Sequence, residues 1–227
     1  MLSALKKLTL AAVAMATLSA CYLPARFDAE VEVTRAGYYS MIFDGYLAHV
    51  TLYDKLRKGE ITEAEEQEWI ERLRRDLVRP SKDPRFQSPV KEFKYFKQGH
   101  FKVNWTKEGD LTKTKSVYFL RRNEHILALK FIRNDMRFSP KKGLPPELIK
   151  GPFIIFEGKS IKKENKTRLV ESGLGTEGTI RLKTDTKVYD HNATRNYKDK
   201  TDPKHTWYVW EIKSIFAHTP KAVMQLR

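Results

Sequence analysis

The chain has a single cysteine, Cys21, among its 227 residues. One thiol excludes a framework of internal disulfides, and it also excludes zinc sites that use several cysteine ligands. The six histidines are far apart in the sequence, with no repeated short spacing that would indicate a metal site. We therefore predict no metal site and no cofactor, and the folded part must be stabilised by packing alone.

Signatures of catalysis are also missing. The sequence has no H-E-x-x-H helix, no G-x-S-x-G elbow and no P-loop. We predict no catalytic residue, and an enzyme is the least favoured of three classes of function. Gly173, Gly175 and Gly178 match G-x-G-x-x-G, but residues 179–183 alternate as a strand, whereas a dinucleotide site requires a helix there. These glycines instead predict a hairpin turn.

Long apolar runs are scarce. The run at residues 8–18 is too short to cross a bilayer, which takes about 20 apolar residues. It follows a start that carries Lys6 and Lys7, and it ends in small residues, as in a secretory signal peptide. We therefore predict that residues 1–20 are a leader that is removed on export.

The end of this leader resembles the lipobox of bacterial lipoproteins. Leu18, Ser19 and Ala20 precede Cys21. The resemblance implies cleavage before Cys21, a diacylglycerol on its thiol and an acyl chain such as palmitate on its new amine. More than one acyl chain is enough for stable anchoring. Tyr22 stands where an Asp would imply retention in the inner membrane, so the periplasmic face of the outer membrane is favoured; the alternative is an ordinary leader ending near Ala20.

Charge of one sign dominates the chain. Lys and Arg number 43 against 28 Asp and Glu, a net charge of +15. Such an excess favours anionic partners such as phospholipid headgroups or lipopolysaccharide phosphates, and an envelope protein is a further candidate partner. Export makes nucleic acid an improbable partner. The lysines around Tyr95 and Trp105 could form a headgroup-binding face, but alternating lysines on the outside of an antiparallel sheet are also a common solubility pattern. We favour solubility for Lys91, Lys94, Lys97 and Lys102.

The hydrophobic periodicity predicts an α+β fold, an antiparallel sheet with one or two helices packed on it. Residues 21–26 are expected to be a tether and residues 27–227 a single domain. Thr62 and Glu65 predict a capping box for a helix over 63–78, and a less regular pattern predicts a helix over 46–58. A helical turn is expected at 147–150, a polar turn at 108–110, and loops at 79–89 and 185–204. Strands are expected at 27–34, 38–43, 93–95, 101–105, 117–120, 126–132, 153–156, 179–183 and 207–216.

The mature part also resembles LppM-like lipoproteins. The resemblance is carried by a strand that ends in Gly158, by the turn His191-Asn192-Ala193, and by a late strand that bears Trp210. It implies an α+β domain on a membrane anchor, with a lipid or glycolipid as ligand. The alternative is an adaptor that docks on an envelope protein complex or on peptidoglycan. A cavity of about 300 Å³ or more would favour the lipid-binding protein, because a domain of this size usually fills its core.

Overall fold

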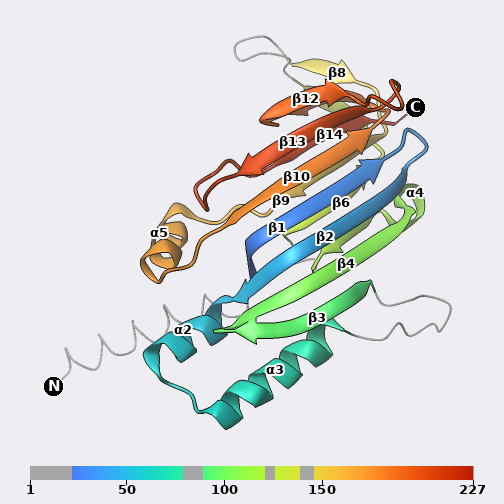
Figure 1. The fold of residues 1–227 in the computed structure, drawn as a ribbon. Helices are drawn as coiled ribbons and strands as arrows, with labels where there is room; N and C mark the ends of the chain where they lie inside the picture. The colour runs from blue at the N-terminus through green and yellow to red at the C-terminus, as the bar shows by residue number, and fades with distance from the viewer. Residues whose placement is uncertain (1–21, 79–88, 121–125, 139–145, 227) are drawn as a thin grey trace, which may run out of the picture.

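A computed structural model describes residues 22–78, 89–120, 126–138 and 146–226 of the chain. Two β-sheets pack face to face over one large hydrophobic core (Figure 1). The predicted α+β fold is confirmed, with helices gathered around the sheets. The predicted lipobox, Leu18 to Cys21, and most of the predicted loop at 79–89 lie outside the described residues.

The larger sheet has seven strands in the order β12-β13-β10-β1-β2-β4-β3. Neighbouring strands are antiparallel except for β1 and β10, which are parallel. Side chains alternate along β1, so Ala29, Val31 and Val33 are buried while the acids between them face outward. The strands are β1 (Tyr22–Val33), β2 (Tyr38–His49), β3 (Val90–Lys97), β4 (His100–Asp110), β10 (Glu177–Thr184), β12 (Arg195–Lys198) and β13 (Thr206–Ile212).

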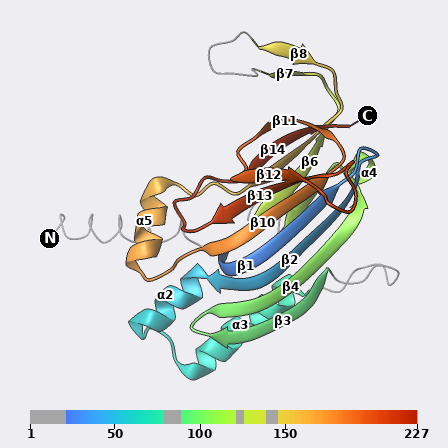
Figure 2. The same ribbon diagram turned by 45° about the horizontal axis from the view of Figure 1, so that its top comes forward.

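The smaller sheet has five strands in the order β11-β14-β9-β6-β5. Its strands are β5 (Ser116–Phe119), β6 (Leu127–Ile132), β9 (Phe153–Gly158), β11 (Lys187–His191) and β14 (Lys221–Gln225). A separate two-stranded ribbon, β7 (Met136–Phe138) and β8 (Glu147–Ile149), projects from one end of the sandwich (Figure 2).

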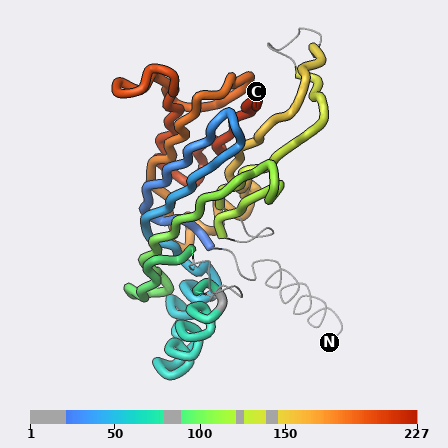
Figure 3. The backbone as a smooth tube through the Cα atoms, turned by 90° about the vertical axis from the view of Figure 1, so that its right-hand side faces the viewer, coloured from blue at the N-terminus to red at the C-terminus, as the bar shows by residue number. Residues whose placement is uncertain are grey.

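Four helices complete the described part of the chain: α2 (Val50–Lys58), α3 (Glu63–Leu77), α4 (Leu111–Thr114) and α5 (Lys163–Glu171). The capping box of α3 is confirmed, since Thr62 and Glu65 each bond the other's backbone amide. Gly59 ends α2 with a φ of +66°, a conformation that favours glycine. Helices α2 and α5 lie at the end of the strands opposite to the β7–β8 ribbon (Figure 2), and the backbone view shows α2 at that end as well (Figure 3).

Aromatic side chains from both sheets fill the core. Phe43 of β2 lies 4.4 Å, between ring centroids, from Phe119 of β5, and Trp105 of β4 lies 5.0 Å from the same ring. All three are almost fully buried. These contacts join the two sheets, since each aromatic side chain buries a large apolar area.

The predicted tether at 21–26 is wrong for residues 22–26. Strand β1 begins at Tyr22, and it pairs Leu23 with Ala48 and Pro24 with Leu47 of β2. The register shifts between Pro24 and Phe27, so proline is tolerated next to an irregularity. Leu23 is buried, and the burial of its apolar side chain stabilises the packing of this segment on the domain.

Several boundaries also differ from the predictions. Residues 46–49 extend β2, so the helix predicted over 46–58 begins only at Val50. The predicted polar turn at 108–110 is the last part of β4. The helical turn predicted at 147–150 is strand β8, and the loop predicted at 185–204 contains β11 and β12. Residues 213–216 leave the strand predicted over 207–216, and β14 follows them.

The glycines at 173, 175 and 178 do not form the predicted hairpin turn. They connect α5 to β10, and β10 then pairs with β1 in the parallel direction. Gly173 has a φ of +93°, and a Cβ at Gly178 would overlap the backbone and ring of Phe27. Glycine is needed at these two positions because the first has a left-handed backbone and the second lies directly against β1.

Candidate functional site

A second, smaller hydrophobic cluster lies at the end of the sandwich where β1 begins. We call this the N-terminal end; it comprises the start of β1, the start of α2, helix α5 and the segment 213–220 between β13 and β14. The cluster is held together by side chains from all four parts, so these distant segments are fixed against one another. Its buried members are Leu23, Ala48, Val50, Leu169, Leu174 and Ile215.

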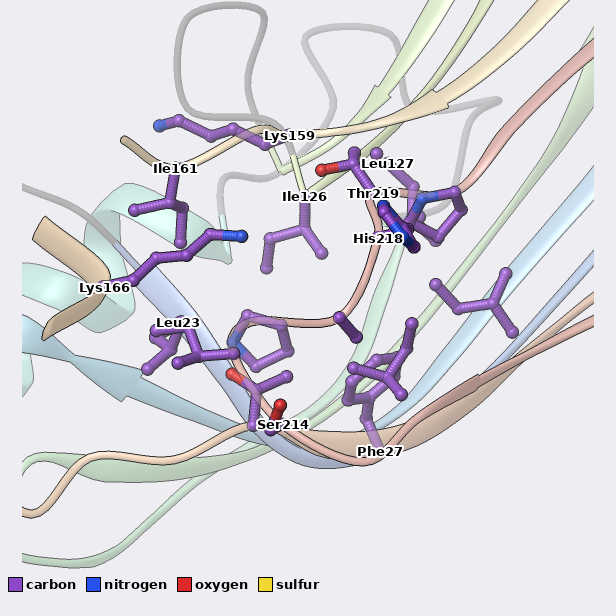
Figure 4. A pocket seen from close by; sticks show the side chains of 18 of the residues that line it. Leu23, Phe27, Ile126, Leu127, Lys159, Ile161, Lys166, Ser214, His218 and Thr219 are labelled. Atoms are coloured by element: carbon purple, nitrogen blue, oxygen red, sulfur yellow. The ribbon is translucent and has the colours of Figure 1, made fainter. Parts of the chain in front are cut away.

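Between this cluster and the main core lies a cavity of about 90 Å³ (Figure 4). Phe27 contributes from the larger sheet, Leu127 from the smaller one and Ile215 from the segment 213–220. Most of the lining is apolar, as in ligand pockets that fix their ligand with only a few polar groups. Other apolar lining residues are Leu23, Ile126, Ile161, Ile180, Ile212 and Pro220.

Several polar side chains of the cavity have no hydrogen-bond or ion-pair partner in the described part of the chain, and Lys166 and Thr176 are two of them. The hydroxyl of Thr176 is buried and makes no hydrogen bond there. The Lys166 side chain extends from α5 into the cavity toward Ile126 (Figure 4), and it makes no ion pair with a described carboxylate. Buried polar groups are normally satisfied. An ammonium and a hydroxyl beside an apolar wall can therefore receive an anionic group whose hydrocarbon part lies in the cavity.

The position of Lys166 follows from the amphipathic pattern of α5. Leu169 is buried in the smaller cluster, and Lys166 lies three residues before it, on the same side of the helix. This side also carries Asn165, which lines a groove of about 160 Å³ next to the cavity. The groove and the cavity share four lining residues, Tyr22, Leu23, Lys159 and Ile161.

The structure brings together the predicted motif His191, Asn192, Ala193 and Trp210. Asn192 is its centre: its Nδ2 donates to the Thr219 carbonyl at 2.7 Å, and its Oδ1 accepts from Trp210 Nε1 at 2.8 Å. The same Oδ1 accepts from the backbone amide of Lys221 at 2.8 Å. Asn192 therefore fixes the chain around Thr219 and Pro220, which form part of the cavity wall.

The rest of the motif supports this asparagine. The Ala193 amide donates to His191 Nδ1 at 3.2 Å, and the His191 ring lies edge-on to Tyr208 at 4.7 Å between centroids. Trp210 packs on Phe156 of the smaller sheet. None of the four motif residues is among the described residues that line the cavity. The motif positions the wall of the site.

The lysines of the predicted headgroup-binding face are only partly available. Lys102 pairs with Asp44 on the next strand. Lys94 and Lys97 are exposed on the edge strand β3, where Lys97 also lies over the Phe96 ring. Lys97 also borders a surface hollow with Leu56, Tyr95 and Phe96, whereas Lys94 and Lys102 line none of the hollows found in the described part of the chain. The solubility interpretation of these lysines stays a prediction.

Two perturbed groups outside the cavity have structural roles. Asp199 accepts from the Thr201 hydroxyl at 2.7 Å, from the Thr201 amide at 2.8 Å and from Trp207 Nε1 at 2.7 Å. These hydrogen bonds hold the pKa of Asp199 well below its usual range. Burial lowers the pKa of His49 to about 4, and its neutral Nδ1 caps α2 by accepting from the Leu52 amide. No three metal-binding side chains converge among the described residues.

Lys166 and Thr176 were not singled out by the sequence. Lys166 belongs to a visibly basic segment, but nothing in the sequence distinguishes it from the neighbouring lysines. Thr176 gives no signal, because its burial depends on the packing of β10, α5 and the segment 213–220. Cys21, Ser19, Ala20 and Leu18 precede the described residues, and Tyr22, which follows Cys21, lines both the cavity and the groove.

The comparisons with known proteins give distant structural likenesses. No family model and no curated protein matches the chain. Among solved structures, the chain is similar to the folded domain of the LppM protein of Mycobacterium tuberculosis, determined by NMR. The likeness covers 90% of this chain and 91% of that one, with 12% identity and a TM-score of 0.40. No helix in the described ranges is long and apolar enough to span a membrane. The described residues form an α+β sandwich with a small, mostly apolar cavity at the N-terminal end.

Proposed function

We propose that this chain is a non-catalytic lipoprotein of the bacterial cell envelope and that its domain binds an anionic amphiphile at the N-terminal end. In this proposal the leader is cut before Cys21, whose acyl chains hold the protein on the membrane. The start of β1 at Tyr22 supports the proposal, since it leaves no spacer between the anchor and the domain. The site would then lie next to the bilayer.

The cavity carries this proposal. It combines an apolar lining with two polar groups, Lys166 and Thr176, that lack a partner among the described residues. A ligand that has both hydrocarbon and negative charge would satisfy both features. Leaving the buried Thr176 hydroxyl without a partner is unfavourable, and a hydrogen bond from it to the ligand would remove that cost. The half-buried Lys166 would add a charge-assisted hydrogen bond to the same anionic group.

The size of the cavity limits the ligand. Its 90 Å³ is well below the roughly 300–1,000 Å³ typical of small-molecule pockets. Part of one hydrocarbon chain fits there, and the adjoining groove of about 160 Å³ offers a path toward Tyr22 and α5. We therefore propose a ligand that inserts one chain, such as a fatty acid or one chain of an anionic lipid, and leaves the rest outside.

Titration with a dansyl-labelled fatty acid tests the proposal. We expect the probe to bind residues 22–227, and Lys166→Ala to weaken binding about tenfold, the loss of roughly one charge-assisted hydrogen bond. Lys94→Ala is the matched control, because it removes an exposed lysine from β3, away from the cavity. Equal affinities of the two variants, or no binding by the unsubstituted domain, would contradict the proposal.

A second function is favoured by the same volume. The cavity is smaller than 300 Å³, so the core is largely filled, as in an adaptor that docks on an envelope protein complex or on peptidoglycan. Crosslinking in intact cells separates the two: a single protein partner, together with failure of the fatty acid to bind, would support the adaptor.

A further inference from the structure

The N-terminal end carries a basic surface outside the cavity. Residues 159–168 contain five basic side chains and one acidic side chain, Glu164. Lys163 and Arg168 are exposed, and Lys213 is exposed in the segment that follows β13. None of these three side chains makes an ion pair or hydrogen bond within the described part of the chain. Their charge is available to an external anion.

Two large apolar side chains are exposed in the same region. Val170 of α5 is 47% exposed, and Phe216 is 51% exposed. Val170 lies seven residues after Lys163, so the two share one face of the helix. Each apolar residue directly follows a buried member of the smaller cluster, Leu169 and Ile215 respectively. The cluster thus holds both exposed residues at the same end of the molecule.

We propose that Lys163, Val170, Lys213 and Phe216 form a membrane-docking surface that rests on anionic lipid headgroups. The cations would lie against phosphates, and the two apolar side chains would enter the headgroup region, as on interfacial amphipathic elements. The proposal rests on the proposed function for the anchor at Cys21 and not for the cavity. The short link from Cys21 to Tyr22 places the surface near the bilayer.

Docking gives the domain a defined orientation. Helix α5 faces the bilayer, while the β7–β8 ribbon lies at the far end of the strands and points away from it (Figure 2). The cavity, which shares Tyr22, Leu23 and Ile161 with the groove beside α5, then opens close to the lipid surface. An amphiphile can reach it without crossing water.

The test uses the whole acylated chain in vesicles of phosphatidylcholine, alone or with an equal part of phosphatidylglycerol. With Cys21 acylated, Val170→Cys provides a single free thiol for an environment-sensitive fluorophore. We expect a blue shift of this fluorophore, and its quenching by brominated lipid, only on the anionic vesicles. A fluorophore at Leu148→Cys, 61% exposed on β8, should report water on both kinds of vesicle.

Charge variants make the test specific. Lys163→Gln with Lys213→Gln should weaken docking about thirtyfold, since each cation near an anionic surface contributes about fivefold, and the blue shift should disappear. Lys94→Gln with Lys107→Gln removes the same charge from β3 and β4 and should leave the blue shift unchanged. Equal loss in both double variants, or a Val170 fluorophore that stays in water on anionic vesicles, would overturn the docking surface.

The two proposals can fail separately. Loss of fatty acid binding with an intact blue shift would reject the cavity and support the docking surface. Fatty acid binding without the blue shift would do the reverse. A chain whose mass shows no acylation and that attaches to neither kind of vesicle would overturn the anchor and the docking surface together.

Discussion

The outer face of the seven-stranded sheet and the N-terminal end are both rich in cations, but among the described residues the cations form ion pairs only on the sheet. On the sheet, Arg181 lies 3.4 Å from Asp28 and 3.7 Å from Glu30, and Lys183 lies 3.5 Å from Asp199. At the N-terminal end, Lys163 and Lys166 have no such partners in the described part of the chain. The cations of the sheet are neutralised by carboxylates of the same domain, whereas the cations of the N-terminal end are available to a ligand or a surface.

The register of the sheet explains the difference. The parallel pairing of β1 with β10 places Glu30 opposite Arg181 and Glu32 opposite Lys183. Opposite charges that are paired across strands stabilise a sheet modestly. Helix α5 has no strand beside it to supply acids in this way, and its buried side faces the cavity. Basic composition alone therefore does not identify a binding surface; cations that make no ion pair within the described part of the chain do.

The largest expected effect concerns the anchor, which gives the N-terminal end its proposed place at the membrane. Cys21→Ser should leave an uncut, unacylated precursor, because the sulfur of Cys21 is the atom that receives the diacylglycerol. Mass spectrometry of the protein from cell envelopes measures both changes. Normal maturation of this variant would remove the proposed reason for the N-terminal end to face a bilayer.

The smaller hydrophobic cluster should contribute strongly to stability. Leu169→Ala should lower the free energy of unfolding by about 2 to 4 kcal/mol, because Leu169 is 6% exposed and its loss leaves a cavity. Val170→Ala, one residue along and exposed, is the matched control and should change it by less than about 0.5 kcal/mol. Urea unfolding measures both. Equal effects would mean that α5 does not pack as described.

The paired face should be sensitive to acid. The pKa of Asp199 is lowered in the folded state from an ordinary value of 3.8, so its contribution to stability is present above that value. The contribution is lost as the pH falls through and below 3.8, because the unfolded chain then takes up a proton that the hydrogen-bonded carboxylate of the folded protein resists. Asp199→Asn should flatten this acid limb in urea unfolding at a series of pH values. Lys166→Ala should leave the acid limb unchanged.

The smallest expected effects are changes of opposite sign in the free energy of unfolding when two threonines are replaced by valine. Thr184 donates to the Val33 carbonyl at 2.6 Å within the larger sheet, so Thr184→Val should lower the free energy of unfolding by about 1 kcal/mol. Thr176 has no described partner, so Thr176→Val should raise it by about 1 kcal/mol while weakening the binding of the fatty acid. Thermal unfolding checks both. A loss of stability in both variants would show that Thr176 has a structural role.

Local signals made much of the fold predictable. The capping box at Thr62 and Glu65 fixed the start of α3, and alternation identified β1, β2 and β4. The predicted tether over 22–26 is wrong because Leu23 pairs with Ala48 of β2. The sequence of the segment 22–26 does not contain the information that β2 extends far enough to pair with it. Strands β11 and β12 are short and polar, so they lack the alternation of half-buried strands.

The site was less predictable than the fold. The cavity joins residues from β1, β6, α5 and the segment 213–220, and it exists only because β10 pairs with β1 about 150 residues away. The hydrophobic periodicity of a single segment does not predict that these distant segments line one cavity. The motif around Asn192 was recognised, but its role in holding the cavity wall depends on Thr219 and Lys221, which only the fold brings to it.

Native mass spectrometry of residues 22–227, exported behind a cleavable leader and purified without detergent, tests the central claim most directly. A discrete added mass that dissociates as an anionic lipid or fatty acid, and that is lost in Lys166→Ala but kept in Lys94→Ala, is the predicted result. A bare protein mass, even after incubation with anionic lipids, would contradict the binding cavity and leave the adaptor as the better account.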